Sequence, residues 1–136
     1  MSEPETPLLE PDARSAPFFE AAARGKLMLQ RCTACRAWHF PVRRRCPACG
    51  REALEFAEAS GRGVVHSHAR TYRASHPALR SRLPLALVAV DLAEGVRVMA
   101  RLADGAPPVR AGDAVEVAFE PAGNALALPV FRPVTR

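Results

Sequence analysis

Apolar residues recur along the chain first at helical spacing and then, from about residue 26 onward, mostly at the spacing of β-strands. The segment SAPFFEAAARGKL predicts a short amphipathic helix of about two turns. Ser15 or Pro17 can begin this helix, and Gly25 can end it. The apolar side chains that share one side of the helix are Phe18, Phe19, Ala22 and Ala23.

The remaining apolar segments predict a chain that is mainly β. KLMLQRC alternates as a strand, and after Gly50 the strand candidates lie within residues 61–73, 84–92, 96–102, 110–120 and 124–133. The run PLALVAVDL is nearly continuous, as expected of a strand covered on both faces, and with VRVMARL it predicts a hairpin from Leu85 to Leu102. Five such strands favour a small barrel of the OB-fold type.

Three regions follow from this pattern. Residues 1–14 are acidic and Pro-rich and predict a disordered tail, residues 15–60 carry the helix and a cysteine-rich segment, and residues 61–136 form the barrel. The polar segment YRASHPALRSRLP is expected to form a loop or short helix at the barrel mouth. No run of 18 apolar residues and no hydrophobic signal core occur, so we expect a cytoplasmic protein without a membrane span.

All four cysteines of the chain lie in two Cys-x-x-Cys pairs separated by ten residues: Cys32, Cys35, Cys46 and Cys49. In a reducing compartment such a double pair favours metal binding over disulfides. Two such turns that face each other place four sulfurs at tetrahedral corners, the arrangement of a rubredoxin-like zinc ribbon. The sequence therefore predicts one structural Zn²⁺, with iron and redox-active thiols as the alternatives.

The two cysteine pairs differ in the residue that follows them. Gly50 follows the second pair and permits a left-handed backbone, whereas Arg36 follows the first pair and predicts a slightly strained turn. Because the four thiolates fill a tetrahedral shell, we expect His39 to be a surface or packing residue. His66 and His68, which alternate along the first barrel strand, are expected to be ordinary strand residues.

Charge is distributed unevenly along the chain. The formal net charge is +5, and a zinc ion held by four thiolates would lower it to about +3. Arg43, Arg44 and Arg45 are expected on a hairpin between the two cysteine pairs. They either balance the thiolate charge or bind phosphate or an acidic partner. Trp38 and Phe40 are expected to cover this hairpin or the barrel.

The order of these parts resembles a known family. The quoted helix, the ribbon with CPACG, and the segments SGRGVVHSHART, LPLALVAVDLAEGVRVMARL, AGDAVEVAFE and LPVFRP are similar to the zinc-ribbon/OB-fold family of acyl-CoA-associated proteins. Members of this family accompany thiolase-like enzymes and steroid side-chain aldolases. The resemblance covers about residues 15–134; it departs from the family at Arg36, where glycine is usual, and at the Phe18–Phe19 pair.

The resemblance implies a non-catalytic accessory subunit of a hetero-oligomer that helps to bind or channel acyl-CoA for a thiolase-like or aldolase partner. Phe18 and Phe19 are then candidates for docking to that partner, and Arg43, Arg44 and Arg45 are candidates for CoA phosphates or docking. The alternative is a protein that binds single-stranded nucleic acid. We expect nucleic acid less, because such OB-folds present stacking aromatics and this barrel offers only Tyr72, Phe119 and Phe131.

Overall fold

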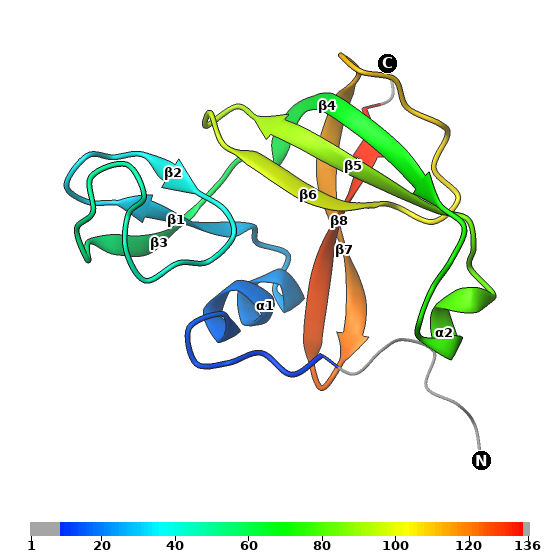
Figure 1. Cartoon of the computed structure of the whole chain (residues 1–136), viewed down its shortest axis with the longest axis horizontal. Coiled ribbons are helices and arrows are strands. Elements are labelled where there is room, and N and C mark those ends of the chain that lie inside the picture. The colour runs from blue at the N-terminus through cyan, green and yellow to red at the C-terminus, as the bar shows by residue number, and fades with distance from the viewer. Residues whose placement is uncertain (1–8, 135–136) are drawn as a thin grey trace.

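The computed structural model describes residues 9–134, which contain two helices, a three-stranded ribbon and a five-stranded barrel (Figure 1). This is the predicted mainly β class, with the ribbon and the barrel in the predicted order. The bounds of the elements are α1 Ala16–Ala23, β1 Met28–Cys32, β2 Trp38–His39, β3 Leu54–Glu58, β4 Arg62–Thr71, α2 Pro77–Arg80, β5 Leu85–Leu92, β6 Arg97–Leu102, β7 Ala114–Gly123 and β8 Leu126–Pro133.

Helix α1 begins at the predicted place. Ser15 is the N-cap residue, and the carboxylate of Asp12 accepts hydrogen bonds from both the backbone N–H and the hydroxyl of Ser15, each at 2.8 Å. Asp12 lies in the predicted tail over residues 1–14, of which residues 1–8 fall outside the described residues. Gly25 follows the helix with φ of +76°, in the left-handed region that favours glycine.

The ribbon sheet has the order β2-β1-β3, and both of its pairings are antiparallel. β2 pairs with β1 across the first cysteine pair, with His39 opposite Gln30. The predicted hairpin within the spacer between the cysteine pairs is therefore wrong, because Trp38–His39 finds its partner strand in β1. Arg43, Arg44 and Arg45 lie instead in an irregular loop that leads to Cys46.

The barrel closes in the order β4-β5-β6-β8-β7, with β6 and β8 parallel and the other pairs antiparallel. β4 closes it by pairing with β7 at Arg62–Val64. Gly63 is required there, because a Cβ at this position would lie 2.4 Å from the carbonyl oxygen of Asp91. The predicted loop at the barrel mouth contains the short helix α2.

β5 corrects one expectation from the sequence. Its buried residues alternate with less buried ones, and Leu87 is 36% exposed. The prediction that this strand is covered on both faces is therefore wrong within this chain, because a closed barrel has only one interior and the outer face of β5 looks away from it. No helix within residues 9–134 is long and apolar enough to cross a membrane.

One continuous core joins the ribbon to the barrel. Phe18 from α1 and Leu27 and Leu29 from the ribbon side belong to the same buried cluster as the barrel residues, which are mostly valines and leucines with Phe131. Trp38 and Phe40 pack against this cluster, as expected. Helix α1 rests on β8, so it fills the angle between the two modules (Figure 1).

Candidate metal centre and adjoining apolar pocket

The four cysteines converge at one end of the ribbon. Their sulfurs all lie within 4.8 Å of one another, and the structure separates Cys32 from Cys49 and Cys35 from Cys46 by 3.6 Å between Sγ atoms. A disulfide needs about 2.05 Å, so these thiols are free. Four sulfurs at about 2.3 Å from one tetrahedral cation are roughly 3.8 Å apart, which matches the observed spacing. The cluster therefore fits one zinc ion.

The two Cys-x-x-Cys turns, here called knuckles, have the same backbone hydrogen bonds and the same left-handed end. In each, the first cysteine accepts at its carbonyl from the N–H four residues on, at 2.8 Å for Arg36 and 2.7 Å for Gly50. Each knuckle then ends in a left-handed residue, Arg36 with φ of +67° and Gly50 with φ of +77°. The strain predicted at Arg36 is thus present, because a side chain at this φ is disfavoured.

The pKa values of the cysteine thiols differ. The backbone N–H of Cys35 is the main cause that lowers the pKa of Cys32 to about 6. The N–H of Ala37 favours the thiolate of Cys35, but hydrogen bonding from Cys35 to Cys46 and burial raise the pKa of Cys35 to about 11. One sulfur therefore ionises readily while its neighbour keeps its proton, so four thiolates together need a bound cation. A zinc ion held there supplies fixed geometry and no open coordination position.

Side chains outside the four ligands hold the ribbon around them. The amide of Gln30, which is 5% exposed, donates to the carbonyl of Arg43 at 2.8 Å and accepts from its N–H at 2.7 Å. Nε2 of His39 lies 3.1 Å from Sγ of Cys46. His39 is not one of the four clustered ligands, as expected, but it contacts one of them.

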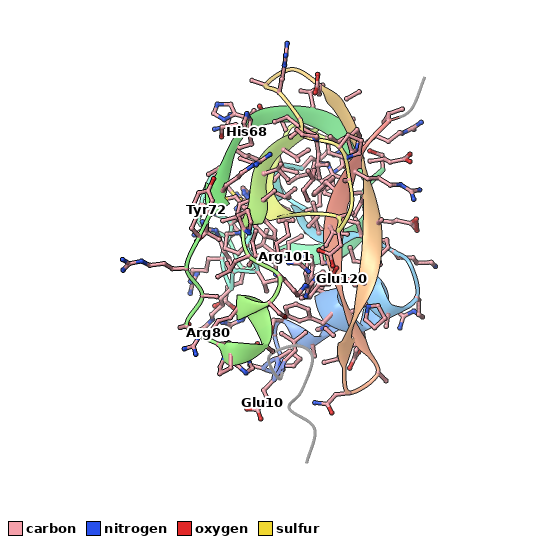
Figure 2. The ribbon with its side chains drawn as sticks, turned by 90° about the vertical axis from the view of Figure 1, so that its right-hand side faces the viewer. Glu10, His68, Tyr72, Arg80, Arg101 and Glu120 are labelled. Atoms are coloured by element: carbon pink, nitrogen blue, oxygen red, sulfur yellow. The ribbon has the colours of Figure 1, made fainter. Side chains whose placement is uncertain are left out.

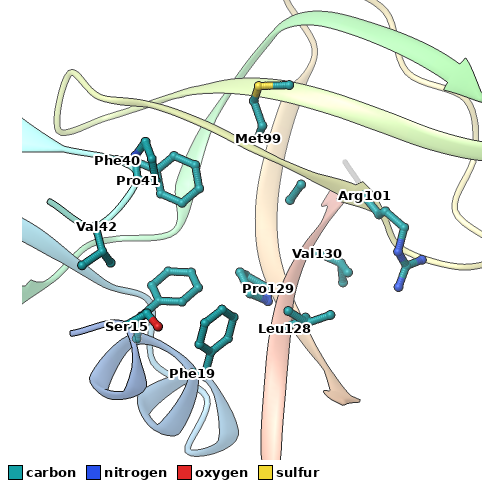
Figure 3. Close-up of a pocket in the computed structure, with 12 residues that line it drawn as sticks. Ser15, Phe19, Phe40, Pro41, Val42, Met99, Arg101, Leu128, Pro129 and Val130 are labelled. Carbon is teal, nitrogen blue, oxygen red and sulfur yellow. The ribbon is translucent and has the colours of Figure 1, made fainter. Parts of the chain in front are cut away.

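An apolar pocket lies between the ribbon side and the barrel (Figure 3). It has a volume of about 430 Å³. One wall comes from α1 and from the spacer between the cysteine pairs, and the other wall comes from β6 and β8. Its main lining residues are Phe18, Phe19, Phe40, Pro41, Val42, Met99, Leu128, Pro129 and Val130.

Arg101 is the only charged residue among those that line this pocket within the described chain. Its guanidinium pairs with the carboxylate of Glu120 (Figure 2) and, at 3.4 Å, with that of Asp104. Arg82 also reaches Asp104 and, at 3.8 Å, Glu120. Burial, followed by the nearby charge of Arg82, lowers the pKa of Arg101. The charged end of the pocket is therefore a closed network of two cations and two anions.

Comparison with known proteins identifies the architecture. Residues 19–55 match the family described as ChsH2, rubredoxin-like zinc ribbon domain, and residues 57–120 match that described as ChsH2, C-terminal OB-fold domain. A solved structure titled "Ltp2-ChsH2(DUF35) aldolase" contains a chain that is 35% identical, with a TM-score of 0.78 over 92% of this chain and 98% of that one. The chain belongs to the ChsH2 family.

Two further similarities extend this result. A "Probable enoyl-CoA hydratase alpha subunit" of Thermomonospora curvata is 37% identical over 117 residues, which cover 85% of this chain and 36% of that protein. The chain thus spans about a third of the length of this relative. A DUF35 protein of unknown function from Sulfolobus solfataricus shares the fold, with 14% identity and a TM-score of 0.57 over 90% of this chain and 86% of that one.

In the structure of this ChsH2-family chain, the other predicted site residues lie as follows. Phe18 is buried and Phe19 is half-buried, and their rings meet edge to face with centroids 5.0 Å apart at the pocket wall. Arg44 and Arg45 both pair with Glu52, at 2.9 and 3.1 Å. Docking and CoA binding by these residues stay predictions. His66 and His68 are exposed on β4, apart from the cysteine cluster, which is the only metal-capable group in the described residues.

Two features of the candidate site in this ChsH2-family chain were not predicted. Gln30 carried a usable signal, because it is a polar residue two positions before Cys32 on an alternating strand and so faces the same side. The pocket carried no comparable signal. Its walls join residues near positions 18, 40, 100 and 129, and no local pattern brings those segments together.

Proposed function

We propose that this chain is an accessory subunit of an acyl-CoA-processing complex in which an aldolase or thiolase-like partner performs the chemistry. Two names support the proposal: the similar solved chain comes from a structure titled as an Ltp2-ChsH2 aldolase, and the T. curvata relative is named as a subunit of an enoyl-CoA hydratase. Neither name says which subunit carries the catalytic residues, and the proposal assigns them to the partner.

The observation that carries the proposal is the apolar pocket. At about 430 Å³ it falls within the range of small-molecule sites, and its one charged lining residue is already paired with carboxylates. Such a pocket is suited to hold an apolar acyl group. It is poorly suited to supply an acid, a base or a nucleophile.

The loop that follows one pocket wall carries the basic residues. Phe40, Pro41 and Val42 line the pocket, and Arg43 comes directly after them with an exposed side chain and no ion pair to the described residues. The pantetheine arm of CoA separates an acyl group from the phosphates, and the proposal is that this arm runs from the pocket along the loop. Arg44 and Arg45 share Glu52, so Arg43 has the guanidinium that is most available to a phosphate.

Binding of acyl-CoA by the tagged full chain tests the pocket. We expect a medium-chain acyl-CoA to bind more tightly than CoA, and Leu128→Asp to weaken the acyl-CoA by at least about tenfold, because a carboxylate in an apolar pocket is costly. Leu87→Asp is the matched control, since Leu87 lies on the outer face of β5 and does not line the pocket. Equal affinities for CoA and acyl-CoA would refute the acyl site.

Co-purification tests the partner. The tagged chain, expressed in its source cells, is expected to bring down a stoichiometric chain that mass spectrometry identifies as thiolase-like or an aldolase. Acyl-CoA turnover should require both chains together. Turnover by this chain alone would assign the chemistry to it and would overturn the accessory role.

The alternative, a protein that binds single-stranded nucleic acid, gains one supporting observation. His68, Tyr72 and Arg80 project outward along one side of the molecule (Figure 2), and Tyr72 is 69% exposed. Of the other barrel aromatics that such binding would use, Phe131 is buried and Phe119 is half-buried. A salt-dependent gel shift with single-stranded DNA or RNA near physiological salt would favour this alternative.

A further inference from the structure

His39 makes a contact that the four-cysteine motif does not require. It lies on β2, is half-buried, and brings Nε2 to within 3.1 Å of Sγ of Cys46. Cys46 is 1% exposed, so this contact is shielded from water. The pairing of His39 with Gln30 of β1 fixes the strand that carries the ring.

The chemistry of the contact follows from the charge of the site. Four thiolates around one divalent cation carry a net charge of −2, so each sulfur is a strong hydrogen-bond acceptor. A neutral imidazole has one N–H to donate, and His39 places a ring nitrogen at donor distance from a single sulfur. His39 lies outside the cluster of four mutually close ligand atoms, so its geometry is that of a donor to a ligand.

We propose that His39 is a positioning residue of the metal site, which donates Nε2–H to the thiolate of Cys46. The bond withdraws negative charge from that sulfur and fixes its direction toward the cation. The lower charge makes the sulfur a weaker nucleophile and so opposes its attack by electrophiles. The fixed direction opposes dissociation of Cys46 from the metal. Groups that hydrogen-bond to metal ligands typically change metal affinity by about 10- to 100-fold when they are lost.

Two substitutions separate the hydrogen bond from the packing of the ring. His39→Phe keeps an aromatic ring on the strand and removes the donor. His39→Gln restores an N–H at the same number of bonds from Cα as Nε2 of histidine. His68→Phe on the exposed part of β4 is the matched control, because it loses a histidine far from the sulfurs.

The readout is the rate at which the zinc-loaded full chain releases metal to a coloured chelator in the presence of a thiol-blocking reagent. We expect release from His39→Phe to be about 10- to 100-fold faster than from the wild type. Release from His39→Gln should be close to that of the wild type, and His68→Phe should be unchanged. Equal rates for the wild type and His39→Phe would overturn the proposal, and so would a His39→Gln variant that behaves like His39→Phe.

The cobalt-loaded chain gives a spectroscopic check. Loss of a hydrogen bond makes a thiolate easier to oxidise, so the sulfur-to-cobalt charge-transfer band of His39→Phe is expected at longer wavelength, and that of His39→Gln near the wild-type position. An unshifted band in His39→Phe contradicts the proposal. Loss of one sulfur-to-cobalt contribution together with a new nitrogen ligand in the wild type would show that His39 is itself a ligand.

A measurement on the unmodified sequence keeps the proposal testable even if the variants fail to fold. In the chain loaded with ¹¹³Cd, a proton on Nε2 that bridges to a metal-bound sulfur should exchange slowly with water. It should also show scalar coupling to the metal across the hydrogen bond. A His39 ring without a slowly exchanging, metal-coupled Nε2–H proton would overturn the assignment.

Discussion

The interiors of the ribbon and the barrel are filled by different kinds of side chain. The barrel interior consists of aliphatic side chains and Phe131, whose exposure is 1%. At the end of the ribbon away from the barrel, the interior consists of sulfurs and the amide of Gln30. Apolar burial stabilises the first without any ligand, whereas four thiolates in the second repel one another until a cation joins them. The comparison predicts that the barrel keeps its structure without the cation and that the cysteine end of the ribbon does not.

Removal of the metal should produce the largest difference in stability between the ribbon and the barrel. Chelation under reducing conditions, or Cys46→Ser, is expected to unfold the ribbon, because structural zinc supplies an apparent ~10–16 kcal/mol in zinc-finger peptides. Strands β4 to β8 should keep their protection, which amide hydrogen exchange resolved by segment will measure. Equal loss of protection in both modules would show that the barrel depends on the cation too.

The barrel is expected to respond to loss of apolar volume. Phe131→Ala should lower the free energy of unfolding by about 3–5 kcal/mol, because it leaves a cavity at the centre of the core. Urea unfolding of the zinc-loaded protein measures this change. Tyr72→Ala is the control, since this exposed ring should contribute within about 0.5 kcal/mol. Similar losses for both variants would mean that the core does not dominate barrel stability.

Gln30 sharpens the comparison, because it is the polar counterpart of a core residue. Gln30→Leu removes both hydrogen bonds to the backbone of Arg43 and leaves its partly buried N–H and C=O without these partners. We expect a cost of about 1–3 kcal/mol and faster hydrogen exchange over residues 41–46. A Leu variant as stable as the wild type would show that the ribbon tolerates an apolar interior as the barrel does.

The order of the modules and the metal ligands could be predicted from the sequence because their signals are local. The spacing of Cys32, Cys35, Cys46 and Cys49 fixes two knuckles, and alternation fixes the strands. The partner of Trp38–His39 could not be predicted, because two residues carry too little pattern to select between strands. The pocket and the pairing of Arg101 with Glu120 also escaped prediction, since both depend on the packing of distant segments.

The smallest expected effect compares the two knuckles with each other. Arg36→Gly should relieve up to about 1 kcal/mol of left-handed strain, partly offset by the greater freedom of glycine in the unfolded chain. The reciprocal Gly50→Ala should cost about 1–2 kcal/mol, although the space around Gly50 is open. Chelator competition for zinc measures both changes. Changes of the same sign in the two variants would argue against backbone strain as the difference between the knuckles.

Phe40, Pro41 and Val42 belong both to the stretch that links the two cysteine pairs and to one side of the apolar pocket. A cation bound by the cysteines would therefore hold this wall of the pocket in place without contacting it. If the sulfurs were oxidised, or if a stronger chelator took the ion, that side would lose its anchor while the barrel side stayed in place. The affinity of the pocket for an apolar ligand should then depend on how much metal the cell supplies.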